Sequence, residues 1–583
     1  MSKMSKSVMQ KQTDKKNGAV INFMGGKSFK LNPLETLKMI AASSIFGEPS
    51  YYRTDSKVRD SKFDTTDTHI IPTEDRILDT RYDGLTTTEI FEQAIDAALD
   101  YDFEATLQLA VDLRKYYFMR LNPQVIAVRA ALHPKRVEFS NAHPMLFRKY
   151  EAQIMGRADE PATQVTYYLH LKGDKAKMPS ILKRSIADKL ASLTRYEVAK
   201  YKNAEIGMIN AVRISHAFSP VLNELMRTGT VQVSEDEETW ERLRSNGMDW
   251  RTLAIEYVIN KKRAGQKPLM GHMALLRNLR NIFQDFQDPA DAGYASELLE
   301  ILKDGVKYGK QFPFRYESAY TVIEKDSDVK FKIRILDALE ECIDIAIDNL
   351  PHLKGKTIAL SDNSGSAWGA LTTEYGSTKV AEIDNLSSVI AAMASDEGYV
   401  GKFGDILKIS GVSKRNGALS QTNALNADRG RDVGHATEAG IWHFFRDAID
   451  SKTWYDNIFI FSDMQAGTGG LYGDGRDLTE YRSRGFGCDL VRTWGRDKDR
   501  MIDVYKLVQT YRSKVNPKVN VFCVQTAGYN NVILPVMTYR TAMLTGWTGK
   551  EILYAAEYIR QWDEIEESRS AESENNSLNT NTI

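Results

Sequence analysis

The chain has little cysteine, almost no net charge and no long hydrophobic run. Three cysteines in 583 residues are too few and too scattered for a disulfide framework or a cysteine-rich zinc site, and they fit a reducing compartment. The 77 lysines and arginines nearly cancel the 78 acidic residues, so any nucleic-acid surface has to be a local patch. No stretch approaches the roughly 18 consecutive apolar residues that span a bilayer. We therefore expect a cytoplasmic protein with no membrane partner.

Several catalytic signatures are absent as well. No G-x-S-x-G elbow surrounds the serines discussed below, and the nine histidines show no H-E-x-x-H spacing. The run Gly25-Gly26-Lys27-Ser28 resembles the end of a P-loop, but Ile21 stands where the first glycine of that motif belongs. These absences favour a protein that is not an enzyme.

Two regions with different patterns of apolar residues lie between polar, charged ends. From Asn32 to about Leu350 apolar residues recur at helical spacing, in runs that cover 103–120, 123–132, 183–201, 220–227, 250–260, 272–283, 296–308 and 333–350. Many short helices with short connections indicate paired-helix repeats. After Lys354 short apolar strands alternate with helices, which predicts a doubly wound parallel sheet.

These patterns predict four segments. We expect disordered tails at 1–20 and 563–583, a helical-repeat module at 21–353 and an α/β domain at 354–562. The boundary near Lys354 marks the point at which the period of the apolar residues changes.

An aspartate and two serines at alternate positions follow the first strand of the α/β region. Asp362, Ser364 and Ser366 come directly after the apolar run 357–360. Mg²⁺ prefers oxygen ligands in near-octahedral geometry, and two short hydroxyls at alternate positions can point into one cavity beside a carboxylate. The pattern predicts a site for Mg²⁺ or another divalent cation. The alternative is an Asp/Ser/Gly turn that only closes the strand.

The D-x-S-x-S pattern resembles the metal site of the von Willebrand factor A domain, to which two further loops contribute a threonine and an aspartate. Asp463 follows a second apolar strand at 457–462 and supplies the aspartate. Thr437, just before a helical run that starts at Ala439, is the predicted threonine. Thr422 and Thr468 remain alternatives.

Five further stretches, in order along the chain, resemble the Ro ribonucleoprotein family, in which a TROVE module precedes a von Willebrand factor A module. They are NPLETLKMIAASSIFGEPSYYR at 32–53, KYK at 200–202, RISH at 213–216, MALLRNL at 273–279 and FPFR at 312–315. The resemblance implies a ring of HEAT-like helical repeats that is closed by the A domain. It also implies binding of small noncoding Y RNAs on the outer surface and of single-stranded ends of misfolded RNA through the central hole. Bacterial relatives use a Y RNA to hold an exoribonuclease.

The candidate RNA-binding residues lie in a locally basic stretch. Residues 181–216 carry seven basic and three acidic side chains. Lys200 and His216 match positions at which the family contacts RNA, and the spacing leaves Lys202 as an alternative to Lys200. Arg213 belongs to the same stretch. Lysine neutralises phosphate, and histidine can bond to phosphate or stack on a base; the alternative for His216 is a structural histidine near a helix end.

Three functions are consistent with these features. The leading one is a non-catalytic ribonucleoprotein that acts in RNA stability, quality control or exonuclease-linked turnover, with the A domain as a metal-dependent docking site. The second is a metal-dependent protein-interaction scaffold with no primary RNA role. The third is a metal-dependent phosphatase or nuclease, which lacks the clustered carboxylates of a two-metal site.

Overall fold

The computed structural model divides into a helical unit and an α/β unit. The helical unit covers Phe91–Asn349, and the α/β unit contains the described residues before position 43 and from Leu350 onward. None of the helices among the described residues combines the length and the apolar character that a bilayer span requires. The structure describes residues 19–21, 27–29, 32–42, 87–116, 119–173, 177–202, 207–233, 239–309, 311–369, 379–462, 475–486, 502–526, 537–545, 551–560, 562–563 and 566–567.

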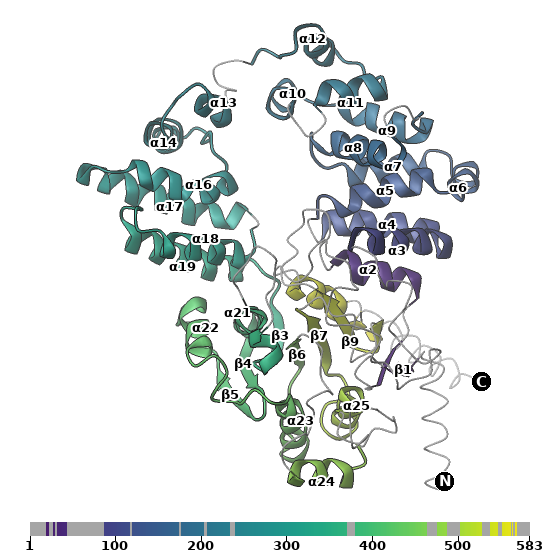
Figure 1. Ribbon diagram of the computed structural model, residues 1–583, viewed down its shortest axis with the longest axis vertical. Helices are drawn as coiled ribbons and strands as arrows, with labels where there is room; N and C mark the ends of the chain where they lie inside the picture. The colour runs from purple at the N-terminus through teal and green to yellow at the C-terminus, as the bar shows by residue number, and fades with distance from the viewer. Residues whose placement is uncertain are drawn as a thin grey trace, which may run out of the picture. The chain divides into compact units, whose positions relative to one another are not determined.

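The first part of the helical unit consists of short helices that pack against near neighbours in the chain (Figure 1). Helix α4 packs on α5 and α7, α5 also packs on α8, and α9 packs on α11. The elements are α3 (Thr87–Tyr101), α4 (Phe103–Lys115), α5 (Asn122–Leu132), α6 (Arg136–Ala142), α7 (Leu146–Ile154), α8 (Glu160–Lys172), α9 (Ser180–Ala191), α10 (Arg195–Tyr201), α11 (Met208–Ser215) and α12 (Pro220–Thr228).

The second part shows the paired-helix pattern most clearly. Helix α16 packs on α17 and α18, while α19 packs on both α17 and α18, so two helical pairs stack on each other. The elements are α13 (Trp240–Ser245), α14 (Trp250–Ala254), the π-helical η6 (Ile255–Ile259), α15 (Asn260–Arg263), α16 (His272–Asp285), the 3₁₀ turn η7 (Pro289–Asp291), α17 (Ala292–Gly309), α18 (Pro313–Lys325) and α19 (Lys332–Asp348).

Two expected helices prove to be interrupted. The run 183–201 forms the two helices α9 and α10 because Thr194 starts a new helix: its hydroxyl accepts from the backbone N–H of Glu197, whose carboxylate accepts from the backbone of Thr194. The run 250–260 contains a π-helical turn at Ile255–Ile259. Helical spacing of apolar residues does not reveal either interruption, because the apolar residues continue at similar spacing across both of them.

A buried polar chain lies inside the first part of the helical unit. Glu151 on α7 is fully buried, and its Oε2 accepts a 2.8 Å hydrogen bond from Gln164 Nε2 on α8. The same amide nitrogen also donates to Gln124 Oε1 on α5 at 2.8 Å. Burial raises the pKa of Glu151 to about 7, and the hydrogen bond from Gln164 only partly opposes this. The stability of these helices therefore depends on pH.

The α/β unit is built on a sheet of seven described strands in the order β5-β4-β3-β6-β7-β9-β8 (Figure 1). The five inner strands run parallel, and β5 and β8 pair antiparallel at the two edges. This confirms the expected parallel α/β sheet and adds the strands β4, β5, β8 and β9, which the sequence pattern did not indicate. The strands are β3 (Leu353–Asp362), β4 (Ser395–Phe403), β5 (Leu407–Gly411), β6 (Asn457–Ser462), β7 (Asn520–Gln525), β8 (Met537–Thr538) and β9 (Thr541–Thr545).

Helices cover this sheet according to the alternation of its side chains. Ile358 and Leu360 of β3 lie in one apolar core with Trp442 of α23 and Tyr511 of α25, whereas α21 packs on β3, β4 and β6. Away from the sheet centre, β1 (Ala19–Ile21) pairs with β2 (Lys27–Phe29), and α2 (Pro33–Ala42) packs on β9. The remaining helices are α20 (Gly365–Gly369), α21 (Val380–Met393), α22 (Ala418–Asn426), α23 (Ala439–Asp450), α24 (Gly475–Ser483) and α25 (Val504–Lys514).

The strand order fixes where a site can form. The chain passes from β3 to β4 on one side and later returns to β6 on the other side of β3. The carboxyl ends of β3 and β6 therefore flank a topological switch point, where open α/β sheets bind ligands. Asp362 and Ser462 are the last residues of these two strands.

Candidate functional site

The predicted metal loop is compact and its carboxylate is held in place. Asp362 is fully buried; its Oδ1 accepts from the backbone N–H of Ser364 at 2.9 Å, and its Oδ2 accepts from Ser462 Oγ at 2.7 Å. The hydroxyl oxygens of Ser364 and Ser366 lie 3.1 Å apart. Burial raises the pKa of Asp362, and the hydrogen bonds from Ser462 and Ser364 oppose this increase. A cation beside this carboxylate would offset the cost of burying its charge.

A second loop, residues 427–438 between α22 and α23, reaches this site through backbone contacts. The N–H of Gly365 donates to the carbonyl oxygen of His435 at 3.0 Å, and a Cβ at Gly365 would meet that oxygen at 2.7 Å. Thr437, two residues further, donates its hydroxyl to Asp405 Oδ1 at 2.8 Å, which leaves an oxygen lone pair for a cation. Thr422 instead bonds to the carbonyl of Ala418 within α22 at 2.8 Å. Of the alternatives among described residues, the contacts favour Thr437.

The donor set suits a hard cation. Ser364, Ser366 and Thr437 offer hydroxyl oxygens and Asp362 a carboxylate, which are ligands that Mg²⁺ accepts. Among the described residues no group of three histidines, cysteines, aspartates or glutamates could hold a metal ion, so a zinc-type cluster is not indicated there. Asp463 and Thr468 lie outside the described residues. The magnesium site therefore stays a prediction, with a loop geometry that fits it.

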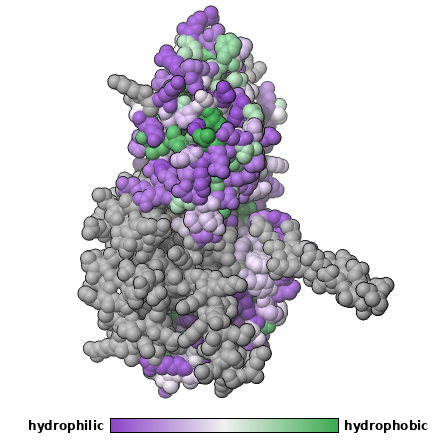
Figure 2. Space-filling model, turned by 90° about the vertical axis from the view of Figure 1, so that its right-hand side faces the viewer, coloured by the Kyte–Doolittle hydropathy of each residue, from purple (hydrophilic) through white to green (hydrophobic). Residues whose placement is uncertain are grey.

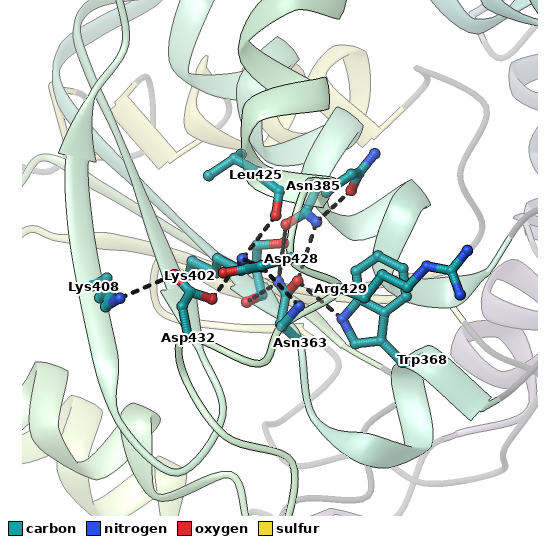
Figure 3. Close-up of polar contacts among 12 residues, drawn as sticks. Asn363, Trp368, Asn385, Lys402, Lys408, Leu425, Asp428, Arg429 and Asp432 are labelled. Carbon is teal, nitrogen blue, oxygen red and sulfur yellow. Dashed lines mark hydrogen bonds and ion pairs between the residues drawn. The ribbon is translucent and has the colours of Figure 1, made fainter.

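Buried amides hold the metal loop from behind (Figure 3). Asn363 Nδ2 donates to Asn385 Oδ1 of α21 at 2.9 Å, while Asn363 Oδ1 accepts from Trp368 Nε1 at 3.2 Å. Asn385 also bonds to Asn426 at the end of α22 at 2.7 Å. Gly430, with φ of +75°, lies so close that a Cβ would meet the carbonyl oxygen of Asn363 at 2.6 Å. These contacts fix the direction in which Ser364 and Ser366 leave the strand.

A lysine inside the sheet anchors the second loop (Figure 3). Lys402 of β4 has a side chain only 5% exposed, and its ammonium lies 2.7 Å from Asp428 Oδ1 and 2.8 Å from Asp432 Oδ1. Burial of Asp428 opposes its ionisation, but the hydrogen bond and charge of Lys402 outweigh this effect and lower the pKa to about 2. Sequence reasoning missed this lysine, although a lysine within an apolar strand is a detectable signal.

His216 projects from a helix end in the helical unit. It closes α11 in the left-handed conformation, with φ of +59°, and its side chain is exposed. The ammonium of Lys183 on α9 lies 3.2 Å from His216 Nε2. Because a lysine ammonium can only donate, this contact is a hydrogen bond when Nε2 accepts, which is the tautomer with the ring proton on Nδ1. The side chain is exposed, and the residue caps the end of α11, so the RNA contact at His216 stays a prediction beside the alternative of a structural histidine at a helix end.

The other predicted RNA contacts form no hydrogen bond with His216 among the described residues, and Lys200 has different partners. Lys200 donates to the hydroxyl of Tyr196 at 3.3 Å and lies 5.9 Å from the ring centroid of Tyr201. Lys202 ends α10, and Arg213 is exposed on α11. Across the described part of the chain no hydrogen bond or ion pair joins Lys200 to His216. The structure thus brings Lys183 to His216, a pairing that spacing alone did not indicate.

The charged side chains available to a ligand are fewer than the sequence count of residues 181–216 suggests, because some of them are paired within the protein. Arg195 is paired with Glu224 at 2.7 Å, and the acidic Asp188 is paired with Arg148. The segment 240–280 carries nine basic and three acidic residues and was not singled out from the sequence. Its exposed Lys262 and the exposed run that follows it come directly after the π-helical turn. The face of the helical unit drawn in Figure 2 is mainly hydrophilic, with scattered apolar residues.

Comparison with known proteins supports the fold. No protein-family model and no curated protein sequence matches the chain. Among solved structures, the crystal structure of the RO (RSR) protein of Deinococcus radiodurans matches with a TM-score of 0.52 and 14% sequence identity. The match covers 80% of this chain and 93% of that chain. It confirms that a helical unit followed by a mixed α/β sheet is the fold of a Ro protein.

Proposed function

We propose that this protein is a non-catalytic RNA-binding protein of the Ro type that acts in the cytoplasm. Its helical unit would bind a small structured noncoding RNA of the Y type and the single-stranded ends of structured or misfolded RNA. Its role would be in RNA stability, quality control or turnover with an exoribonuclease. The observation that carries the proposal is the exposed pair of His216 and Lys183, which lies in a chain with the fold of a Ro protein.

The chemistry of that pair suits a phosphate backbone. Lys183 contributes a positive charge, and the Nδ1–H of His216 is left as a donor beside it. Asp188 on the same helix as Lys183 is paired with Arg148, so it does not cancel this charge. A neutral chain with one such exposed donor surface binds a polyanion locally and with strong salt dependence.

The A-domain site would have a docking role. Asp362, Ser364, Ser366 and Thr437, with Asp463 from the next loop, would hold Mg²⁺ or another divalent cation. When bound, that ion would offer a coordination position to a carboxylate of a protein partner. Among the described residues no cluster of carboxylates of the kind that two-metal hydrolysis uses surrounds this loop.

Binding of a small hairpin RNA with a single-stranded 3′ tail tests the RNA function. His216→Asn keeps the left-handed backbone, which asparagine tolerates, and Lys183→Met keeps most of the side-chain packing. The double variant should bind the RNA roughly ten- to a hundredfold more weakly at fixed salt, because it loses charge-assisted hydrogen bonds. Fluorescence anisotropy measures the affinity.

Lys189→Met is the matched control, since it removes one positive charge from the same helix at a different position. It should change the affinity much less than Lys183→Met. Equal affinity of the wild-type protein and the double variant would reject the assigned surface. Partners that all survive RNase treatment of a native purification would favour the protein scaffold over the RNA-binding protein.

A further inference from the structure

The segment that follows α11 displays two side chains outward on either side of a buried one. His216 is exposed, Ala217 is buried, and Phe218 is 77% exposed. His216 ends α11 in the left-handed conformation, and the exposed Phe218 follows it two residues later. The Cα atoms of residues two apart in a chain lie no more than about 7 Å from each other, so the two exposed side chains start from neighbouring points of the backbone. An aromatic face is thereby presented beside a hydrogen-bonding imidazole.

This segment is fixed at both ends. The backbone N–H of Ala217 donates to Ser215 Oγ at 3.3 Å, and the N–H of Leu222 donates to Ser219 Oγ at 3.3 Å. Ser219 is extended, with φ of −154° and ψ of +163°, as expected for the residue before Pro220. Phe218 therefore does not depend on a flexible loop for its position, and little entropy is lost when a ligand packs on it.

The surroundings of Phe218 are cationic. Lys183 contacts His216, and Arg213 is exposed one helical turn before His216. The acidic Glu224 on α12 is engaged by Arg195 and by the backbone N–H of Gln232. Single exposed apolar residues are common and carry no meaning alone. An exposed phenyl ring held beside cations matches the requirements of an unpaired nucleotide, which has a flat base and an anionic phosphate.

We propose that Phe218 is a stacking platform for an unpaired RNA base, whose neighbouring phosphate is held by His216 and Lys183. This inference rests on the proposed RNA-binding function and assigns its preference for single-stranded over paired RNA to one residue. Stacking is tolerant of base identity because every base has an aromatic face. The platform would select unpaired segments rather than a particular sequence.

The test compares Phe218→Ala, Phe218→Trp and wild type on two probes of equal length, a single-stranded oligouridylate and a blunt, fully paired RNA duplex of two strands. Base–aromatic stacking corresponds to a roughly five- to hundredfold loss of affinity on truncation to alanine. Phe218→Ala should show that loss for the single strand and change duplex binding less than about twofold. Phe218→Trp should bind the single strand about as well as wild type, and the fluorescence of the new tryptophan should be quenched when the single strand binds.

Tyr308→Ala is the matched control, because Tyr308 is 85% exposed in the same helical unit but on α17. Phe218→Ala should also leave the salt dependence of binding unchanged, since no phosphate contact is removed. Wild-type binding of the single strand with no effect of Phe218→Ala would overturn this inference and leave the RNA-binding function standing. Failure of the wild-type protein to bind either probe would overturn the proposed function itself.

Discussion

Asp362→Asn separates the charge that a cation needs from the hydrogen bonds that the fold needs. Asparagine keeps a carbonyl oxygen for the backbone N–H of Ser364, and its amide can donate to Ser462 Oγ, which can rotate to accept. The substitution therefore removes one fully buried negative charge and preserves the shape of the loop. In the presence of a chelator the variant should be at least as stable as wild type, because an uncompensated buried charge is costly.

The magnesium-linked stabilisation sets the size of the effect. At a free Mg²⁺ concentration of 100 times Kd, binding to the folded state alone adds about 2.7 kcal/mol to the free energy of unfolding. For a unit of roughly 200 residues, each kcal/mol raises Tm by about 2–4 °C. The unfolding transition of the wild-type α/β unit should therefore rise by about 5–10 °C. With Asp362→Asn the rise should fall below about 1 °C, since the charged ligand is lost.

Differential scanning fluorimetry in EDTA and in a MgCl₂ series measures both values. Asp396→Asn is the matched control: the same substitution at the amino end of β4, where an exposed Asp396 accepts from the backbone of Gly355 at 2.7 Å. The control should keep the full magnesium shift. A shift that persists in Asp362→Asn, or that disappears equally in the control, would refute the assignment of Asp362 as the charged ligand.

Three further outcomes are expected. Lys402→Met should lower the free energy of unfolding by roughly 1–3 kcal/mol in urea titrations. This loss is smaller than that expected for a fully buried ion pair, because Asp428 and Asp432 are partly exposed. The same variant should show a smaller magnesium-induced rise in Tm. Burial raises the pKa of Glu151 to about 7, so the folded state is favoured most below pH 4.5 and this contribution is lost as the pH rises through about 7. Glu151→Gln should abolish this pH dependence, which amounts to about 2–3 kcal/mol between urea melts at pH 5 and pH 8. Substituting Lys261, Lys262 and Lys267 by methionine should reduce the slope of log affinity against log salt by about one to three, and an unchanged slope would exclude this segment from the RNA surface.

Helices of the first region were predictable because caps and apolar spacing are local. The helical region expected to start at Asn32 begins with α2 at Pro33, where the backbone N–H of Thr36 bonds to the carbonyl of Asn32. The break at Thr194 could also be predicted from the T-x-x-E pattern that ends at Glu197. It was missed because apolar residues continue at helical spacing on both sides of it. Strand β4 was missed because Lys402 stands in its buried half, and only the aspartates brought there by the fold make a buried lysine tolerable.

The candidate sites show the same limit on prediction from sequence. Asp362, Ser364 and Ser366 lie within five residues, so a motif identifies them. Ser462, which bonds to Asp362, is 100 residues away in the chain, and only the parallel pairing of β3 with β6 brings it there. Lys183 reaches His216 across 33 residues because α9 packs on α11. Contacts of this kind depend on strand order and helix packing, which a single sequence does not specify.

Both candidate sites present alternate residues on either side of an anchored one. Ser364 and Ser366 flank Gly365, whose N–H is held by the carbonyl of His435. His216 and Phe218 similarly flank Ala217, which is buried and held through its N–H. In both candidate sites the N–H of the middle residue is hydrogen-bonded, at Gly365 to a carbonyl of a distant loop and at Ala217 to the nearby hydroxyl of Ser215. These contacts constrain the backbone from which the outer side chains leave. Substitution of Gly365, where a Cβ would meet the carbonyl oxygen of His435 at 2.7 Å, is therefore expected to disturb the metal loop without removing any of its oxygen ligands.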